Sequence, residues 1–243
     1  MEGISRRSLL KGVGAAAATV VVGGCDGRAR QDARQPPAYT FLTADDASFI
    51  EPAVARLIPS DEIGPGALEA GVPTYIDRQL AGPWGAGAQL YRQGPWHSAP
   101  PQFGYQLPFT PAELFRNALR ALTHDLQRSA GGSFSKLGPD EQDAYLESLE
   151  KQSRDLNGVP SVVFFESLLD LTVEGYFCDP VYGGNQNMVG WKLVGFPGAY
   201  ANYYELVDQH GIAFMRPPVS LAQDGGGAMH AHLVRPASQQ KGK

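Results

Sequence analysis

Apolar residues recur at every third or fourth position in several runs between residues 43 and 171, which predicts a series of amphipathic helices. The first run follows Thr43-Ala44-Asp45-Asp46, which resembles a capping box with Asp in place of the usual Glu. Pro52 lies inside this run, so we expect a helix that either kinks or begins late. The apolar face of this helix consists of Phe49, Ile50, Ala53, Val54, Leu57 and Ile58.

Two more helices are predicted before residue 132. A short one runs from Val72 to Leu80, with Pro73 in its first turn. The next begins at Thr110-Pro111-Ala112-Glu113, where Thr is the cap, Pro opens the first turn and Glu stands three residues after the Thr. We expect Gly131-Gly132 to close it. Its apolar stripe consists of Leu114, Phe115, Ala118, Leu119, Leu122 and Leu126.

The remaining helices are predicted in the second half of the chain. One begins at Pro139 and turns Tyr145, Leu146 and Leu149 inward. Residues 160–171 are apolar nearly all round, which is typical of a helix in the core. A last helix is predicted over residues 200–210, with Tyr203, Tyr204 and Val207 as candidates for burial. These patterns predict a mainly α fold, a single irregular domain of about six helices with long loops rich in Gly, Pro and aromatic residues.

Two segments combine many glycines and prolines with aromatic residues. Residues 81–108 include two tryptophans, and a connection of that length is usually functional or draped over a partner. Residues 172–198, which we call the glycine-aromatic segment, directly follow the most apolar run of the chain after its N-terminal region. Glycine and proline shape the backbone, but such a density of rings is unlike a linker. We therefore expect an ordered loop whose rings are buried in the chain's own core or against another protein.

The N-terminus has the arrangement of an export signal. Arg6-Arg7 precede a modestly apolar segment, Gly12–Val22, and paired arginines before such a segment mark the twin-arginine type. The alternative is a chance Arg-Arg before a short membrane helix, but the apolar segment is about half of the roughly 20 residues that a span needs. Residues 1–24 are therefore predicted to be a twin-arginine signal peptide. That route carries proteins already folded, often with a cofactor or a partner attached.

The signal ends in Val22-Gly23-Gly24-Cys25, which resembles the lipobox of bacterial lipoproteins, so Cys25 is a candidate for lipidation. The alternative is an ordinary small-residue cleavage site with an incidental Cys. The second of the two cysteines is Cys178, and the two can pair only if Cys25 stays in the mature chain without lipid. Cys178 is equally suited to be a small buried apolar residue.

Composition and charge restrict the classes of function. The chain has 243 residues, 43% of them hydrophobic, and a formal net charge of −5, so it lacks the basic footprint of a nucleic-acid-binding protein. Removing residues 1–24 takes away more bases than acids and makes the chain more acidic still. We expect a tether over residues 25–39, the helical domain over 40–216 and a flexible tail over 217–243.

Motifs for cofactor chemistry are absent from the sequence. It contains no Gly-x-Gly-x-x-Gly dinucleotide motif, no P-loop, no Cys-x-x-Cys-His haem site and no Gly-x-Ser-x-Gly elbow. Two cysteines cannot ligate an iron–sulfur cluster alone. If the chain belongs to a redox system, another chain must hold the cofactor.

Three parts of the chain carry a resemblance to a known family. Residues 174–185, followed by Met188-Val189-Gly190-Trp191-Lys192 and Gly195-Phe196-Pro197-Gly198, resemble the motif of the gluconate 2-dehydrogenase subunit 3 family. Residues 40–61 resemble the opening helix of that family, and residues 137–168 its middle. The resemblance covers roughly residues 40–204.

This resemblance implies the small accessory subunit of a membrane-associated, FAD-dependent sugar or sugar-acid dehydrogenase facing the periplasm. The implied partners are a large flavoprotein of the glucose–methanol–choline oxidoreductase type, which holds FAD, and a multihaem cytochrome c, which holds haem. The small subunit would supply the twin-arginine export signal and stabilise the flavoprotein, with no catalytic, cofactor-binding or metal-binding residue of its own. The matching residues, expected to be structural or to contact the partner, are Tyr176, Cys178, Asp179, Tyr182, Gly183, Gly184, Asn185, Trp191, Gly195 and Pro197.

Two other classes of function stay open. One is a free-standing exported enzyme or metal-binding protein that uses Asp179, Asn185, Glu174 or the histidines, including His230 and His232. The other is a lipoprotein with a purely structural role, attached to the membrane through Cys25.

Overall fold

The fold is mainly helical, as the sequence predicts. The computed structural model describes residues 38–221 except 89, 98–99, 101–102, 104, 130–131, 200–203 and 213–215. The chain divides into residues 1–36 and 37–243, and only the second unit contains described residues. Arg6, Arg7 and Cys25 therefore lie outside them. The six α-helices of the described part are α2 (Ala44–Leu57), α3 (Val72–Ala81), α4 (Pro111–Ser129), α5 (Pro139–Lys151), α6 (Ser161–Phe177) and α7 (Val189–Val194).

Short elements connect these helices. Strands β1 (Asp155–Leu156) and β2 (Val159–Pro160) form a two-stranded antiparallel hairpin between α5 and α6. The single-turn 3-10 helices are η2 (Phe134–Lys136), η3 (Pro180–Tyr182), η4 (Gln186–Met188) and η5 (Tyr204–Leu206). Within the described residues, no helix is both long enough and apolar enough to cross a membrane.

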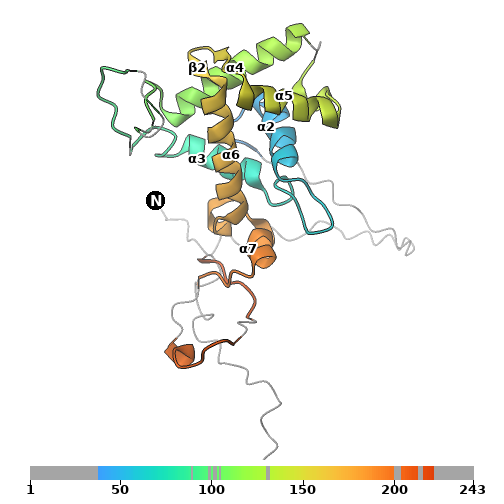
Figure 1. Ribbon diagram of the computed structural model, residues 1–243, viewed down its shortest axis with the longest axis vertical. Coiled ribbons are helices and arrows are strands. Elements are labelled where there is room, and N and C mark those ends of the chain that lie inside the picture. Colours follow the sequence, from blue (N-terminus) through green and yellow to red (C-terminus); the bar gives the residue numbers. More distant parts are fainter. Residues whose placement is uncertain are drawn as a thin grey trace, which may run out of the picture. The chain divides into compact units, whose positions relative to one another are not determined.

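Helix α6 is the centre of the hydrophobic core, and α2, α3, α4 and α5 all pack against it (Figure 1). The ring of Phe164, which is fully buried, lies 5.3 Å from that of Phe115 on α4 and 6.1 Å from that of Phe49 on α2. The Phe49 ring in turn packs against the tilted ring of Phe134 on η2, with centroids 4.7 Å apart. The helix predicted to be apolar on every side is therefore the one that the others surround.

The helix starts follow the capping signals in the sequence. At α2, the Asp46 backbone N–H donates to Thr43 Oγ1 (3.2 Å), and the Thr43 N–H donates to the Asp46 carboxylate (2.9 Å). At α4, Thr110 and Glu113 form the same reciprocal pair, at 3.1 and 2.7 Å. Each pair satisfies two of the N–H groups that a helix start leaves without backbone partners.

Of the two alternatives expected for α2, a kink or a late start, the late start is wrong. It starts at Ala44, directly after the capping pair, and continues through Pro52 to Leu57. The proline cannot donate to the Ser48 carbonyl. The cap and the burial of Phe49, Ile50 and Val54 outweigh that one missing bond.

The apolar stripe of α4 is confirmed in full. Its buried residues are the six that the periodicity indicates. On α5, Leu146 and Leu149 are buried as expected, while Tyr145 is only partly buried and packs at the edge of the core.

Two boundaries differ from the expectation. The first six residues of the glycine-aromatic segment, Thr172–Phe177, are the last turns of α6, and the segment also contains the helix α7. The apolar face of α6 continues through Leu171 and Tyr176, so burial extends the helix past the first glycine. The helix predicted over 200–210 is reduced, in its described part, to the single turn η5, and the side chains of Tyr204 and Val207 are exposed rather than buried.

A buried carboxylate fastens the N-terminal end of the described chain to the core. Asp77, on α3, accepts hydrogen bonds from the backbone N–H groups of Thr40, Phe41 and Leu42 at 2.8–3.1 Å. The carboxylate thereby orients the segment that leads into α2.

Candidate partner-binding surface

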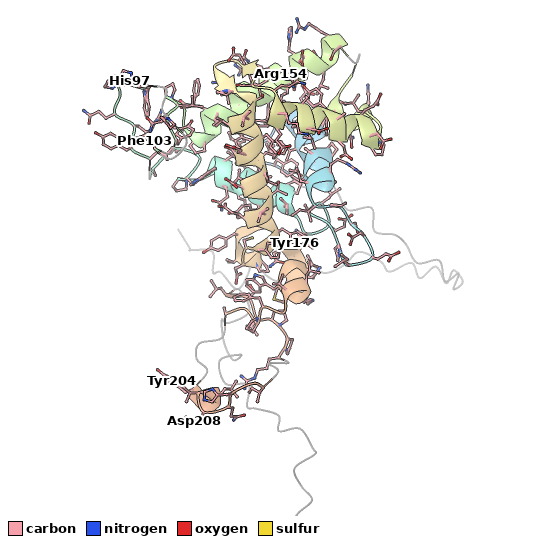
Figure 2. The ribbon with its side chains drawn as sticks, viewed as in Figure 1. His97, Phe103, Arg154, Tyr176, Tyr204 and Asp208 are labelled. Atoms are coloured by element: carbon pink, nitrogen blue, oxygen red, sulfur yellow. The ribbon has the colours of Figure 1, made fainter. Side chains whose placement is uncertain are left out.

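The glycine-aromatic segment is held against the C-terminal end of α6. Tyr176, labelled in Figure 2 near the point where α6 meets α7, is buried and donates its hydroxyl to the Pro65 carbonyl at 2.7 Å. This bond joins α6 to the connection between α2 and α3. The Tyr176 ring packs edge-on against Phe177, with centroids 5.1 Å apart.

Trp191 fastens α7 to the same end of α6. Its side chain is buried, and its indole Nε1 donates to the Phe177 carbonyl at 2.7 Å. The last carbonyls of a helix lack N–H partners within that helix, so the indole satisfies one of them. The Trp191 ring also packs edge-on against Phe196, at 5.2 Å.

Asn185 is the polar centre of the segment. It is fully buried and adopts the left-handed conformation, with φ of 44°. Its Nδ2 donates to the Cys178 carbonyl and its Oδ1 accepts from the Gly190 N–H, both at 2.8 Å. Because Asn tolerates left-handed backbone and offers both a donor and an acceptor, one residue links the end of α6 to the start of α7.

Two glycines allow the backbone to approach α6 closely. A Cβ atom at Gly184 would lie 2.1 Å from the Gly175 carbonyl oxygen, and one at Gly190 would lie 2.2 Å from the Tyr176 oxygen. By contrast, Gly183 and Gly195 have φ of 103° and 69°, so there the backbone conformation favours glycine.

Asp179 connects the segment to the chain that follows it. Its carboxylate accepts from the Val181 N–H at 2.9 Å, which caps η3, and from the Ser220 hydroxyl at 2.7 Å. The Leu221 N–H donates to the second carboxylate oxygen at 2.8 Å. The Pro197 carbonyl adds a bond from the Val219 N–H at 3.1 Å.

Cys178 lines an open depression of about 420 Å³ beside α3 and α6. Burial raises the pKa of its thiol to about 11, and the negative charges of Asp179 and Glu174 add to this effect. Glu174 also accepts from the Tyr75 hydroxyl at 3.1 Å. The thiol is therefore protonated near neutral pH and is a poor nucleophile in this chain. The other lining residues are Tyr75, Gln79, Glu174, Phe177, Asp179 and Tyr182.

Most of the exposed large side chains of the glycine-aromatic segment are apolar. The buried polar groups of the segment are satisfied inside the chain, while several large apolar side chains are exposed to solvent. We call these residues the α6–α7 apolar surface: Val173, Phe177, Val181, Tyr182, Leu193, Val194 and Phe196. The sequence predicted rings buried in the chain's own core or against another protein: Tyr176 and Trp191 are buried in the chain itself, whereas Phe177, Tyr182 and Phe196 are exposed on it.

The described side chains considered for an alternative catalytic or metal site, Glu174, Asp179 and Asn185, make hydrogen bonds within the chain. Asp179 and Asn185 are engaged in the backbone contacts described above, and Glu174 bonds to Tyr75. Among the described residues, no three His, Cys, Asp or Glu side chains lie together as they would around a metal ion. His230 and His232 lie outside the described residues.

The comparison with protein families gives one clear result. A family model described as gluconate 2-dehydrogenase subunit 3 matches residues 44–198, more than half of the chain. The matched range begins at the first residue of α2 and ends with the last residue of the glycine-aromatic segment. No curated protein and no solved structure is similar enough to the chain to count as a match.

Proposed function

The chain belongs to the gluconate 2-dehydrogenase subunit 3 family, and from this premise we propose that it is a non-catalytic accessory subunit of an FAD-dependent sugar or sugar-acid dehydrogenase. The catalytic flavoprotein subunit, of the glucose–methanol–choline oxidoreductase type, would hold FAD. A multihaem cytochrome c would pass the electrons on to the membrane quinone pool. In this proposal the flavin and haem chemistry takes place on the partner chains, and this chain stabilises the flavoprotein.

One observation carries the proposal: the glycine-aromatic segment is polar inside and apolar outside. Asn185, Asp179 and Trp191 use their polar atoms to fix the backbone of the segment. Its exposed side presents the α6–α7 apolar surface. A catalytic site needs polar side chains that point toward one another and have atoms available to bind a substrate or a metal. A protein–protein interface instead needs a fixed backbone and exposed apolar area.

The accessory role is tested by producing the flavoprotein with and without this chain. We expect co-purification, and a higher yield of flavin-loaded flavoprotein when both are present. The isolated chain should show no turnover of sugars or sugar acids with an artificial electron acceptor. Turnover by the isolated chain would show that the accessory assignment is wrong.

Export forms the second part of the proposal. Arg6-Arg7 would direct this chain, together with the bound flavoprotein, through the twin-arginine translocase to the periplasm. Replacing both arginines by Lys should leave the two proteins in the cytoplasm together. Cell fractionation with antibodies against each protein measures this, and continued export of the flavoprotein would exclude a shared signal.

Attachment to the inner membrane would come from the complex or from lipid on Cys25. Mass spectrometry of the mature N-terminus distinguishes the two, because a lipoprotein begins with a diacyl- or triacyl-glyceryl Cys25. More than one acyl chain anchors a protein stably, whereas a single chain binds only marginally. An unmodified N-terminus at another residue would leave the complex as the attachment.

A further inference from the structure

A depression of about 450 Å³ is formed by α4 and the residues that begin the β1–β2 hairpin, among them Arg154, which Figure 2 labels. This volume lies within the range of small-molecule binding sites. The charged residues of its lining are Arg120, His124, Asp125, Arg128, Arg154 and Asp155. Three arginines and a histidine thus stand with two aspartates, in a chain whose formal net charge is −5. Basic groups are therefore concentrated here against the overall charge of the chain.

The α4 side of the depression is a row of basic residues. Arg120, His124 and Arg128 follow one another at intervals of four, so they lie on one side of the helix. The helix dipole favours bases only near the C-terminal turn, which accounts for Arg128. Arg120 and His124 lie in earlier turns, and within the part of the chain that the structure describes neither side chain forms an ion pair or a hydrogen bond. Their donors are therefore available to a ligand.

Arg154, on the other side of the depression, is held in place through its backbone. Its N–H donates to Ser161 Oγ at 3.0 Å, and its carbonyl accepts from the Ser161 N–H at 2.8 Å. Ser161 is the first residue of α6 and is fully buried. The guanidinium carbon of Arg154 lies 5.2 Å from the centre of the Tyr145 ring. Contacts to the core therefore fix the position of this arginine.

The positive charge of the depression is only partly compensated by its own aspartates. Asp125 accepts from Arg154 Nη1 at 3.2 Å with one oxygen and from Arg128 Nη2 at 3.3 Å with the other. One carboxylate is thus shared by two arginines, and Nε and Nη2 of Arg154 are buried with no acceptor among the described residues. Asp155 uses its Oδ1 within the hairpin, where it accepts from the Gly158 N–H at 2.8 Å. A further anion would neutralise the charge that remains.

We propose that this depression binds a phosphate group between the basic row of α4 and Arg154. Arginine matches phosphate and carboxylate oxygens with its planar fork of donors. A phosphate monoester carries about −1.5 to −2 charges near neutral pH and three acceptor oxygens. A ligand carboxylate, with one charge, adds no more than Asp125 already supplies, so phosphate fits the site better. The group is carried either by a soluble phosphate ester or by a phospholipid headgroup, and the proposal does not depend on the accessory function.

The test titrates the purified full-length chain with inorganic phosphate at constant ionic strength, by isothermal titration calorimetry. We expect saturable binding with a Kd of about 1 mM or below. Arg120→Gln should weaken it about tenfold or more, because a hydrogen bond between charged groups is lost. Arg120→Lys keeps the charge without the fork and should recover only part of the affinity. The matched control is Arg78→Gln, at an exposed arginine that does not line the depression, with a change below about threefold.

Vesicles distinguish the two sources of the phosphate group. The wild-type and Arg120→Gln chains are sedimented with phosphatidylcholine vesicles that contain or lack phosphatidic acid. If wild-type cosedimentation needs phosphatidic acid and Arg120, and inorganic phosphate displaces it, the ligand is a lipid headgroup. If inorganic phosphate binds but this cosedimentation does not occur, the ligand is a soluble phosphate ester.

Three results would overturn the phosphate site. The first is a wild-type chain that shows native circular dichroism but no saturable phosphate binding. The second is an Arg120→Gln chain that binds phosphate as tightly as the wild type, or that loses no more affinity than Arg78→Gln. The third is full affinity in Arg120→Lys, which would indicate attraction of counterions by a basic surface without a specific site. None of these results depends on flavoprotein binding, so the site and the accessory function are tested separately.

Discussion

The helical core and the part of the glycine-aromatic segment that follows α6 are stabilised by different interactions. In the core, the fully buried side chains are large and apolar, such as Phe115, Leu119, Phe164 and Leu168. Between residues 178 and 198, the buried positions are Asp179, three glycines, Asn185 and a single tryptophan. The core is filled by apolar volume, whereas the segment is built from hydrogen bonds and close backbone contacts.

This difference predicts different responses to substitution. Apolar cores tolerate exchanges that conserve volume, because many weak contacts share the stabilisation. A buried polar group stabilises only while its partner is present, and an unsatisfied partner costs free energy. The core should therefore respond to lost volume, and the segment to the loss of particular atoms.

The largest effect is expected at the centre of the core. Phe164→Ala removes the ring between Phe49 and Phe115, and the free energy of unfolding should fall by about 3–5 kcal/mol. Denaturant unfolding followed by circular dichroism measures this. The control Phe103→Ala, at an exposed ring, should change stability by no more than about 0.5 kcal/mol. A loss below about 1 kcal/mol at Phe164 would contradict the central place of α6.

The next effect is expected at Asn185. Asn185→Ala leaves the Cys178 carbonyl and the Gly190 N–H without their partner, at about 1–3 kcal/mol each. Unfolding should show a loss of about 2–6 kcal/mol for the two groups together, and the tryptophan fluorescence should change because Trp191 lies beside these contacts.

Asn185→Gly separates the two roles of this residue. Glycine accepts the left-handed backbone without strain but makes neither side-chain bond. If Asn185→Gly is as stable as the wild type, the hydrogen bonds are unimportant and the contrast between core and segment fails.

The parts of the fold that could be predicted from the sequence are the helices whose buried and capping residues recur three or four positions apart. The stripe of α4 and both capping pairs are visible as spacings of three and four, because a helix brings those positions together. Two expectations were wrong where the apolar periodicity ends, at the end of α6 and after residue 203. Gly175 suggested a loop, yet it lies inside α6, where it leaves room for the Tyr75 ring. Tyr204 and Val207 have aromatic and apolar side chains, yet both are exposed.

The candidate site could be located but not interpreted from the sequence. The density of glycines and rings marks the segment, yet its contacts join residues far apart, such as Tyr176 to Pro65 and the Gln186 N–H to the Ala70 carbonyl. No local pattern states which carbonyl a glycine must approach. Nor does it distinguish the buried Trp191 from the exposed Phe196, five residues later.

A smaller effect is expected at Gly190, where glycine is needed because the backbone of α7 lies close to α6. Gly190→Ala brings a Cβ to 2.2 Å from the Tyr176 carbonyl oxygen, so α7 must move, at a cost of about 1–3 kcal/mol. Ala is otherwise the better residue within a helix, so any loss reports the close contact. Gly64→Ala, with no atom within 4 Å of the added Cβ, is the matched control and should be nearly neutral. Equal stabilities for the two variants would exclude the close approach of α7 to α6.

The smallest effect on stability is expected from the Cys178 thiol. Burial raises its pKa to about 11, above the roughly 8.5 of an unfolded Cys. The protonated thiol therefore favours the folded state, fully so below the unfolded pKa, and this contribution is lost as the pH rises from about 8.5 through 11. In a Cys25→Ser chain, Cys178 is the remaining thiol, and iodoacetamide at pH 7.5 should alkylate the folded protein on the order of a hundredfold more slowly than the denatured one. The rate for the folded chain should climb until about pH 11. If the alkylation rate instead reached a plateau near pH 8.5, the Cys178 thiol would be solvated. The glycine-aromatic segment would then not cover the end of α6.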